Sequence, residues 1–184
     1  MKENIVLIGF MGCGKTSTGS LLAEAMEYQF LDTDQTIEDE SHTKISDIFE
    51  RMGEDYFRNL ETSTIENMTH QVTHAVISTG GGLPMRECNA AILKELGFVV
   101  YLRVKKETVL ERLKGDTTRP LLQGENVSDK VSSLLAFRDP IYEVSAHLTI
   151  DVDEKNFEQI IDEIKRNYEI MQLRQKEKRE KNVL

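Results

Sequence analysis

Residues 9–16 read GFMGCGKT and directly follow the apolar run at residues 5–8. They match the pattern G-x-x-x-x-G-K-[ST], whose glycines let successive backbone N–H groups point toward a bound phosphate. Lys15 would reach the β- and γ-phosphates of a nucleotide, and the Thr16 hydroxyl would bind magnesium. Because a strand-like run precedes the loop and a helical pattern follows it, the stretch predicts nucleotide binding. The residues expected to contact the nucleotide here are Gly12, Cys13, Gly14, Lys15, Thr16 and Ser17.

Short apolar runs alternate with amphipathic stretches along the rest of the chain. The strand candidates are residues 5–8, 29–31, 75–78, 98–102 and 147–150. The helix candidates are residues 15–27, 45–68, 86–96, 105–114, 127–144 and 156–171. This alternation predicts an α/β fold, a three-layer αβα sandwich around a five-stranded parallel sheet of the P-loop NTPase type.

The domain organisation predicted from these patterns is one domain with two appendages. A single domain is expected over residues 1–171, and the polar stretch at about 115–126 is expected to form a mobile lid. Residues 172–184 carry five basic and two acidic side chains and are expected to be a charged, solvated or frayed helix end.

The composition narrows the class of partner. The chain has 184 residues, of which 39% are hydrophobic and 30% charged, with a formal net charge of −9. A negatively charged protein repels the phosphate backbone of nucleic acid, so a nucleic-acid partner is not expected. No apolar stretch approaches the roughly 20 residues that span a bilayer. Two cysteines make no disulfide framework, and strand-like sequence begins almost at residue 1. We therefore expect a cytoplasmic monomer with a small-molecule substrate, and no nucleic-acid or membrane partner.

Two carboxylates, Asp32 and Asp34, follow the second strand candidate. In an extended segment they would point the same way, toward the ligand-binding edge of the sheet. Asp32 could hold magnesium through water together with Thr16, since Ser78 occupies the place where many P-loop proteins have an acid. Asp34 could accept the proton of an acceptor hydroxyl. The alternative is that Asp34 caps a helix beginning after Thr33, which leaves Asp32 without a role.

Glycines and arginines complete the candidate site. The run at 79–82, TGGG, follows the third strand candidate and leaves bare backbone for a ligand, although a tight turn would explain it equally well. Arg58 has Glu61 one helical turn later to orient it, and Arg138 lies in the helical stretch before the last strand. Either arginine could instead form a surface ion pair. Arg119, in the expected lid, could cover the phosphates and stabilise transition-state charge.

Six motifs in this order, GFMGCGKT, DTD, GEDYFRNLE, TGGG, TRPLL and RDPIY, make the chain resemble the shikimate kinase family of P-loop kinases. The resemblance covers residues 5 to about 167. It implies transfer of the γ-phosphate of ATP to the 3-hydroxyl of shikimate, with Mg²⁺, in the biosynthesis of aromatic amino acids through chorismate.

The resemblance also implies roles for individual residues. Lys15, Asp34 and Arg119 would be catalytic, and Arg119 and Arg112 would contact ATP, the latter near adenine. Arg58 and Arg138 would hold the shikimate carboxylate, Asp34 would bind its hydroxyls, and the glycines would line the same pocket. The substrate-binding residues are thus expected to be Asp34, Arg58, Gly80, Gly81, Gly82 and Arg138.

Four other nucleotide-binding functions fit these motifs less well. A gluconate-type sugar-acid kinase also combines a P-loop with an anionic polyol, but DTD, GEDYFRNLE and RDPIY favour shikimate. A nucleoside monophosphate kinase would need base- and phosphate-binding motifs that we do not find. A GTP switch or regulatory ATP-binding module usually carries N/T-K-x-D, and the closest stretch, residues 43–46, lacks the aspartate. Dinucleotide binding fails because Ser17 stands where the third glycine would be needed.

Overall fold

The computed structural model describes residues 2–114 and 126–181. All strand pairs in its five-stranded sheet are parallel, and the strand order is β2-β3-β1-β4-β5. The strands are β1 Ile5–Ile8, β2 Gln29–Asp32, β3 Ala75–Ser78, β4 Phe98–Arg103 and β5 Leu148–Asp151. The helices are α1 Lys15–Met26, α2 Thr33–Ser41, α3 Ile45–Met52, α4 Glu54–Gln71, α5 Glu87–Leu96, α6 Lys106–Arg112, α7 Val127–Ser145 and α8 Phe157–Lys181, with a 3₁₀ turn η1 at Leu83–Met85.

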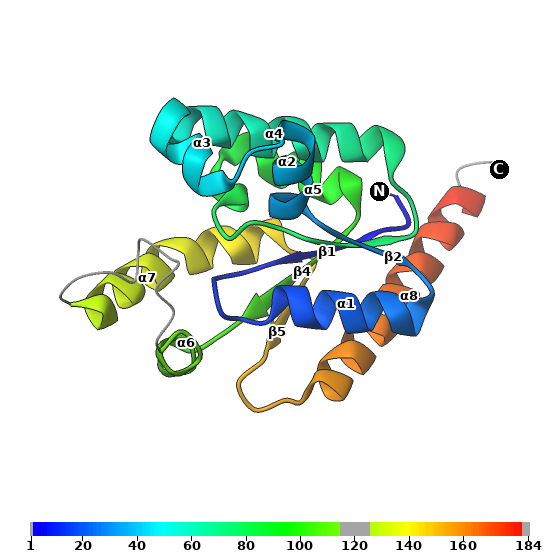
Figure 1. The fold of residues 1–184 in the computed structure, drawn as a ribbon. Coiled ribbons are helices and arrows are strands. Elements are labelled where there is room, and N and C mark those ends of the chain that lie inside the picture. Colours follow the sequence, from blue (N-terminus) through cyan, green and yellow to red (C-terminus); the bar gives the residue numbers. More distant parts are fainter. Residues whose placement is uncertain (1, 115–125, 182–184) are drawn as a thin grey trace.

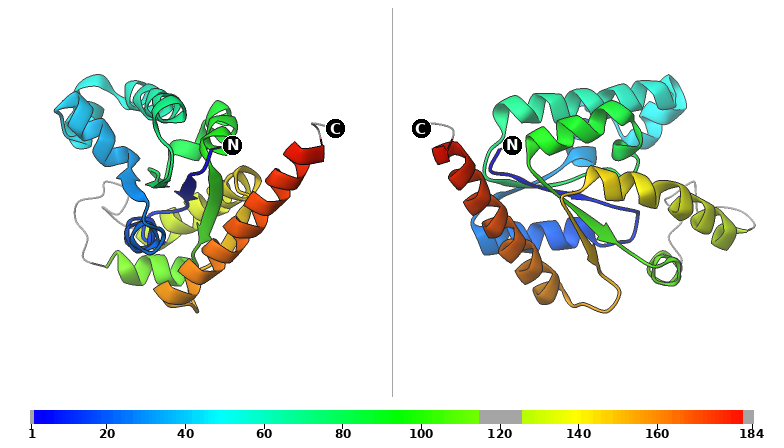
Figure 2. Two further views of the ribbon diagram at one scale, coloured as in Figure 1. Left: turned by 90° about the vertical axis from the view of Figure 1, so that its right-hand side faces the viewer. Right: turned by 180° about the vertical axis from the view of Figure 1, so that it is seen from behind.

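Helices cover both faces of the sheet and make three layers (Figures 1 and 2). Helices α1 and α8 lie on one face, and α4, α5 and α7 lie on the other. Strands buried on both faces are largely apolar, and every residue of β1 and β3 is buried, Ser78 being the one polar residue among them. The predicted fold class is therefore confirmed, and it brings the loops after β1, β2 and β3 to one edge of the sheet.

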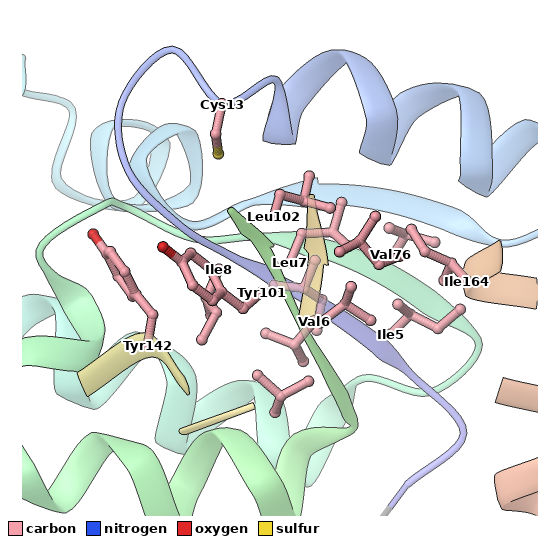
Figure 3. Packing of buried hydrophobic residues seen from close by; sticks show 14 of the residues in the cluster. Ile5, Val6, Leu7, Ile8, Cys13, Val76, Tyr101, Leu102, Tyr142 and Ile164 are labelled. Atoms are coloured by element: carbon pink, nitrogen blue, oxygen red, sulfur yellow. The ribbon is translucent and has the colours of Figure 1, made fainter. Parts of the chain in front are cut away.

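The main core lies on both faces of the central strands, and Figure 3 shows part of it beneath the phosphate loop. A smaller second core joins α2, α3 and α4 beside the sheet. It consists of the buried residues Ile37, Ile48 and Phe57, with Ile45 and Leu60 packed against them. This second core supports the part of the chain that carries Asp34 and Arg58. Among the described helices, none is long and apolar enough to cross a membrane.

Three details differ from the sequence predictions. The single helix expected over residues 45–68 is two helices, α3 and α4, because Gly53 between them has φ 83°, which a helix cannot accommodate. Residues 33–41, expected to begin as extended chain, form α2. Helix α8 continues to Lys181, so residues 172–181 prolong a regular helix. Residues 115–125 of the expected lid, with Arg119 among them, lie outside the described residues.

Candidate active site

The phosphate loop has the backbone angles that its glycines allow. Gly12 has φ 75° and Gly14 has φ 96°, and Gly14 is also the N-cap of α1. The positive end of α1 and the N–H groups of the loop therefore face the same space, as binding of a phosphate requires. The Lys15 ammonium donates hydrogen bonds to the carbonyl oxygens of Gly9 at 2.7 Å and Phe10 at 3.0 Å. The lysine thus folds back over its own loop.

Further residues expected at the nucleotide surround this loop. The Arg112 guanidinium donates to the carbonyl oxygen of Gly12 at 2.9 Å, which places it directly on the loop. Ser17 is exposed in the first turn of α1. The Cys13 side chain is buried and points from the loop toward the sheet (Figure 3). Its Sγ lies 3.7 Å from Lys15 Nζ, so a contact of Cys13 with a nucleotide would come from its backbone.

Asp32 combines two interactions at the end of β2. Its Oδ1 accepts hydrogen bonds from the backbone N–H groups of Asp34 at 3.0 Å and Gln35 at 3.4 Å, so Asp32 is the N-cap of α2. Its Oδ2 accepts from the Thr16 hydroxyl at 3.4 Å. The alternative in which Asp34 is the cap is therefore wrong. The extended alternation expected for the two carboxylates is also wrong, because the cap starts the helix at Thr33.

Asp34, Glu61 and Arg58 converge on the glycine run that follows β3. A Cβ atom built on Gly80 would lie 2.6 Å from Asp34 Oδ1 and 2.9 Å from Glu61 Oε1. A Cβ built on Gly82 would lie 2.6 Å from Arg58 Nη1. A side chain at either glycine would therefore collide with these groups, which explains why the run is bare. Three elements far apart in sequence supply this cluster.

The Arg58 guanidinium is held from both sides. It donates to Glu61 Oε2 at 2.7 Å and to Glu54 Oε1 at 2.8 Å, so the expected pairing with Glu61 is present. Its Cζ lies 5.4 Å from the centre of the Phe57 ring and 6.0 Å from that of Phe49, within the range of a cation–π contact. These contacts fix the planar fork of donors that a carboxylate ligand would meet.

Glu61 is an acid in an unusual setting. Only 1% of its side chain is exposed, and burial raises its pKa to about 7, although Arg58 works in the opposite direction. The nearby negative charge of Asp34 raises the pKa further. The buried carboxyl group therefore changes its protonation state close to neutral pH.

Arg138 approaches from α7, on the other side of the glycine run. Its guanidinium Cζ lies 5.7 Å from the centre of the Phe10 ring in the phosphate loop. Its Nε is buried and makes no hydrogen bond to the described residues, while the guanidinium interacts with the Tyr142 hydroxyl. One turn later, the Tyr142 hydroxyl donates to the carbonyl oxygen of Gly81 at 2.5 Å. Arg138 thus lies between the phosphate loop and the glycine run.

Sequence reasoning missed two contacts of this site. The approach of Glu61 to Gly80 joins residues that no local pattern relates. The bond from Tyr142 to Gly81 could have been suspected, because Tyr142 belongs to the RDPIY motif that drew attention to Arg138.

A phosphate loop that faces a carboxylate and two arginines across a glycine run defines a P-loop kinase with a small anionic acceptor. Comparison with known proteins makes this specific, since residues 11–169 match the family model described as Shikimate kinase. The chain belongs to the shikimate kinase family. The shikimate kinase of Thioalkalivibrio sulfidiphilus is 42% identical to it over 166 residues, which cover 90% of this chain and 87% of that protein.

Solved structures agree with this assignment. The structure described as shikimate kinase from Acinetobacter baumannii in complex with shikimate has a TM-score of 0.82 and 40% sequence identity, and the match covers 89% of this chain and 91% of that one. A gluconokinase from Sinorhizobium meliloti has a TM-score of 0.57 at 19% identity, covering 95% of this chain and 99% of that one. The second likeness shows a common fold alone. The alternative of a sugar-acid kinase thus shares the architecture, whereas the sequence relationship lies with shikimate kinases.

Proposed function

We propose that this protein transfers the γ-phosphate of ATP to the 3-hydroxyl of shikimate, giving shikimate 3-phosphate and ADP on the route to chorismate and the aromatic amino acids. The observation that carries the proposal is the convergence of Asp34, Arg58 and the glycine run, beside the phosphate loop. Shikimate is a carboxylate with adjacent hydroxyls, so it needs cationic donors at one end and an acceptor at the other. This cluster offers both.

On the nucleotide side, we assign the phosphates to Lys15, the N–H groups of residues 12–17 and the N-terminus of α1. Lys15 would exchange its bonds to the carbonyls of Gly9 and Phe10 for bonds to β- and γ-phosphate oxygens. The family resemblance implies that Arg112 would lie near adenine, and in the structure it contacts Gly12 of the phosphate loop. Arg119 would approach the phosphates from the lid and stabilise charge during transfer.

Mg²⁺ is proposed at Thr16 and Asp32, with Asp32 binding through water. A hydroxyl and a carboxylate are the hard oxygen donors that magnesium prefers, and here they lie 3.4 Å apart. When bound, magnesium would neutralise part of the charge on the transferred phosphate.

On the acceptor side, Arg58 and Arg138 would bind the carboxylate of shikimate, and Gly80, Gly81 and Gly82 would let the ring approach the backbone. Asp34 would accept the hydrogen bond of the 3-hydroxyl and take its proton. As the hydroxyl oxygen bonds to the γ-phosphorus, the bond from that phosphorus to the bridging oxygen breaks, and ADP leaves with the electron pair.

The setting proposed for this activity is a cytoplasmic monomer that binds neither membranes nor nucleic acid. The net charge of −9 supports the absence of a nucleic-acid partner. Residues 1–171 would form the single kinase domain with its lid at about 115–126, and residues 172–184 a charged extension.

The test is ADP release in the presence of ATP and magnesium, with shikimate, gluconate, a nucleoside monophosphate or no acceptor. We expect ADP release when shikimate is the acceptor, and none with gluconate, a nucleoside monophosphate or no acceptor. Equal turnover without any acceptor would contradict the kinase function and leave only nucleotide hydrolysis. Omission of magnesium, with EDTA present, should abolish turnover; activity that persists would remove the metal from the proposal.

A further inference from the structure

Two carbonyl groups, one in the glycine run and one directly after it, accept hydrogen bonds from buried side chains that have no role so far. Tyr142 of α7 donates its hydroxyl to the carbonyl oxygen of Gly81 at 2.5 Å. Asn89 of α5 donates its amide to the carbonyl oxygen of Leu83 at 2.8 Å. Tyr142 is 0% and Asn89 1% exposed; the bond to Leu83 is buried, and the bond to Gly81 is partly buried. The C-terminal part of the run, together with the residue that follows it, is thus held by side chains from two different helices.

The first of these bonds ties the run to the helix that carries Arg138. Tyr142 lies one turn after Arg138, so the two side chains share one face of α7. The Tyr142 ring packs on that of Tyr101, with 5.0 Å between the ring centres, and both rings lie under the phosphate loop (Figure 3). The Tyr101 hydroxyl in turn donates to Asp139 Oδ1 at 2.7 Å. The turn of α7 around Arg138 is therefore anchored to both β4 and Gly81.

The second bond ties the run to the helix that carries Arg58. Asn89 Oδ1 lies 2.9 Å from the Thr62 hydroxyl oxygen, which is 3.1 Å from the carbonyl oxygen of Arg58. A hydroxyl has one proton to donate, and Arg86 Nη1 already donates to the Arg58 carbonyl at 3.2 Å. Asn89 Oδ1 can only accept, so the Thr62 hydroxyl donates its proton in the bond to Asn89, and the Thr62 oxygen itself accepts from Arg86 Nη1 at 3.2 Å. Through Thr62 and Asn89, the turn of α4 around Arg58 is joined to Leu83.

The site has little tolerance for movement of these parts. A Cβ on Gly82 would lie 2.6 Å from Arg58 Nη1, so the run and the arginine are as close as bare backbone permits. A carboxylate presents two oxygens at a fixed spacing, and a misplacement of about 1 Å in such a site can cost about a hundredfold in rate. The distance between the two guanidinium groups is therefore a quantity that the fold must control.

We propose that Tyr142, Asn89 and Thr62 are positioning residues that use the glycine run as a spacer and set the separation of Arg58 and Arg138. This inference rests on the proposed function, in which those arginines bind one carboxylate. Tyr142 and Asn89 bond to the backbone of the site, the Tyr142 hydroxyl also interacts with the Arg138 guanidinium, and Thr62 acts through Asn89. Removal of the three positioning residues should weaken acceptor binding while the phosphate loop keeps its affinity for nucleotide.

The test compares Tyr142→Phe and Thr62→Val with two matched controls. Tyr168→Phe also removes a buried hydroxyl, but beside Phe98 at the opposite end of β4. Thr69→Val removes a hydroxyl two turns along α4, where it donates at 2.6 Å to Glu66 of its own helix. Steady-state kinetics would give KM for shikimate and KM for ATP, and urea unfolding would report the stability of each variant.

We expect KM for shikimate to rise about fivefold to tenfold in Tyr142→Phe and in Thr62→Val, with KM for ATP changed less than about twofold. The controls should change neither. In an Arg58→Ala background, Thr62→Val should have no further effect on binding of shikimate, because its action passes through Arg58. If the free energies of unfolding of Tyr142→Phe and Thr62→Val equal those of the two controls, a rise in KM for shikimate reports positioning and not a general loss of stability.

An unchanged KM for shikimate, equal increases in both KM values, or full additivity with Arg58→Ala would each overturn the inference. If the wild-type protein itself does not phosphorylate shikimate, the proposed function fails. If the wild-type protein phosphorylates shikimate and the variants show the same KM values as the wild type, the proposed function stands and the positioning role fails.

Discussion

Replacing Glu61 with glutamine should change how the stability of the fold depends on pH. The pKa of Glu61 is raised from an ordinary value of 4.5 to about 7 by burial. Between these two values, the folded protein holds a proton at this carboxyl group that the unfolded chain has released. The contribution of Glu61 to stability is therefore fully present below about pH 4.5 and is lost as pH rises through about 7.

The size of this loss follows from the distance between the two pKa values. At about 1.4 kcal/mol for each pKa unit, it amounts to about 3 kcal/mol. Glutamine has nearly the same shape and does not titrate. The free energy of unfolding of the wild type, minus that of Glu61→Gln, should thus fall by about 3 kcal/mol between pH 4.5 and pH 8.

The measurement is urea unfolding of both proteins at half-unit pH steps. Glu54→Gln is the matched control, because Glu54 also pairs with Arg58, but its side chain is 66% exposed. The control should follow the pH profile of the wild type within about 0.5 kcal/mol, as exposed pairs contribute little. A wild-type minus Glu61→Gln difference that is flat or rises with pH would refute the reasoning. It would mean that pairing with Arg58 outweighs burial and keeps Glu61 ionised throughout.

Three further outcomes are expected from kinetics and nucleotide binding. Gly80→Ala should abolish turnover with shikimate, because the alanine Cβ would lie 2.6 Å from Asp34 Oδ1. Gly81→Ala should keep much more activity, because the nearest atom to its Cβ would be 3.4 Å away, and similar losses in both variants would contradict this reasoning. Asp34→Asn should lower kcat about 10² to 10⁴-fold with little change in ATP binding, and a normal kcat would exclude Asp34 from proton transfer. Arg58→Ala and Arg138→Ala should each raise KM for shikimate by about 10 to 100-fold, while calorimetry shows ATP binding intact; a matching loss of ATP affinity would argue against the carboxylate role.

The fold was predictable because the central strands of a parallel sheet are buried on both faces, here β1, β3 and most of β4. The runs 5–8 and 75–77 are apolar throughout and stand out from the helical periodicity around them. The break at Gly53 was harder to place, because apolar residues recur at helical spacing on both sides of it. A glycine inside such a pattern is compatible with one helix or two. In the structure, residues on both sides of Gly53 pack with Ile37 of α2 in the second core, an arrangement that the spacing does not encode.

The candidate site was predictable where a motif lies within one loop and unpredictable where it depends on tertiary contacts. The phosphate loop needs only the residues 9–16 and its flanking elements. Whether Asp32 or Asp34 caps α2 depends on where the strand ends, and boundaries are the least certain part of a sequence reading. The burial of Glu61 follows from the approach of α4 to Gly80, which no spacing in the sequence encodes.

Asp32 contacts both halves of the candidate active site. One of its oxygens holds the first turn of α2, which carries Asp34, and the other faces Thr16 on the nucleotide side. A ligand that reorients this carboxylate also acts on the helix end from which Asp34 projects. Nucleotide and acceptor would then each alter the affinity for the other by the same factor, since coupling of binding free energies is reciprocal. In the proposed function, this one carboxylate would therefore couple the binding of nucleotide to the binding of the acceptor.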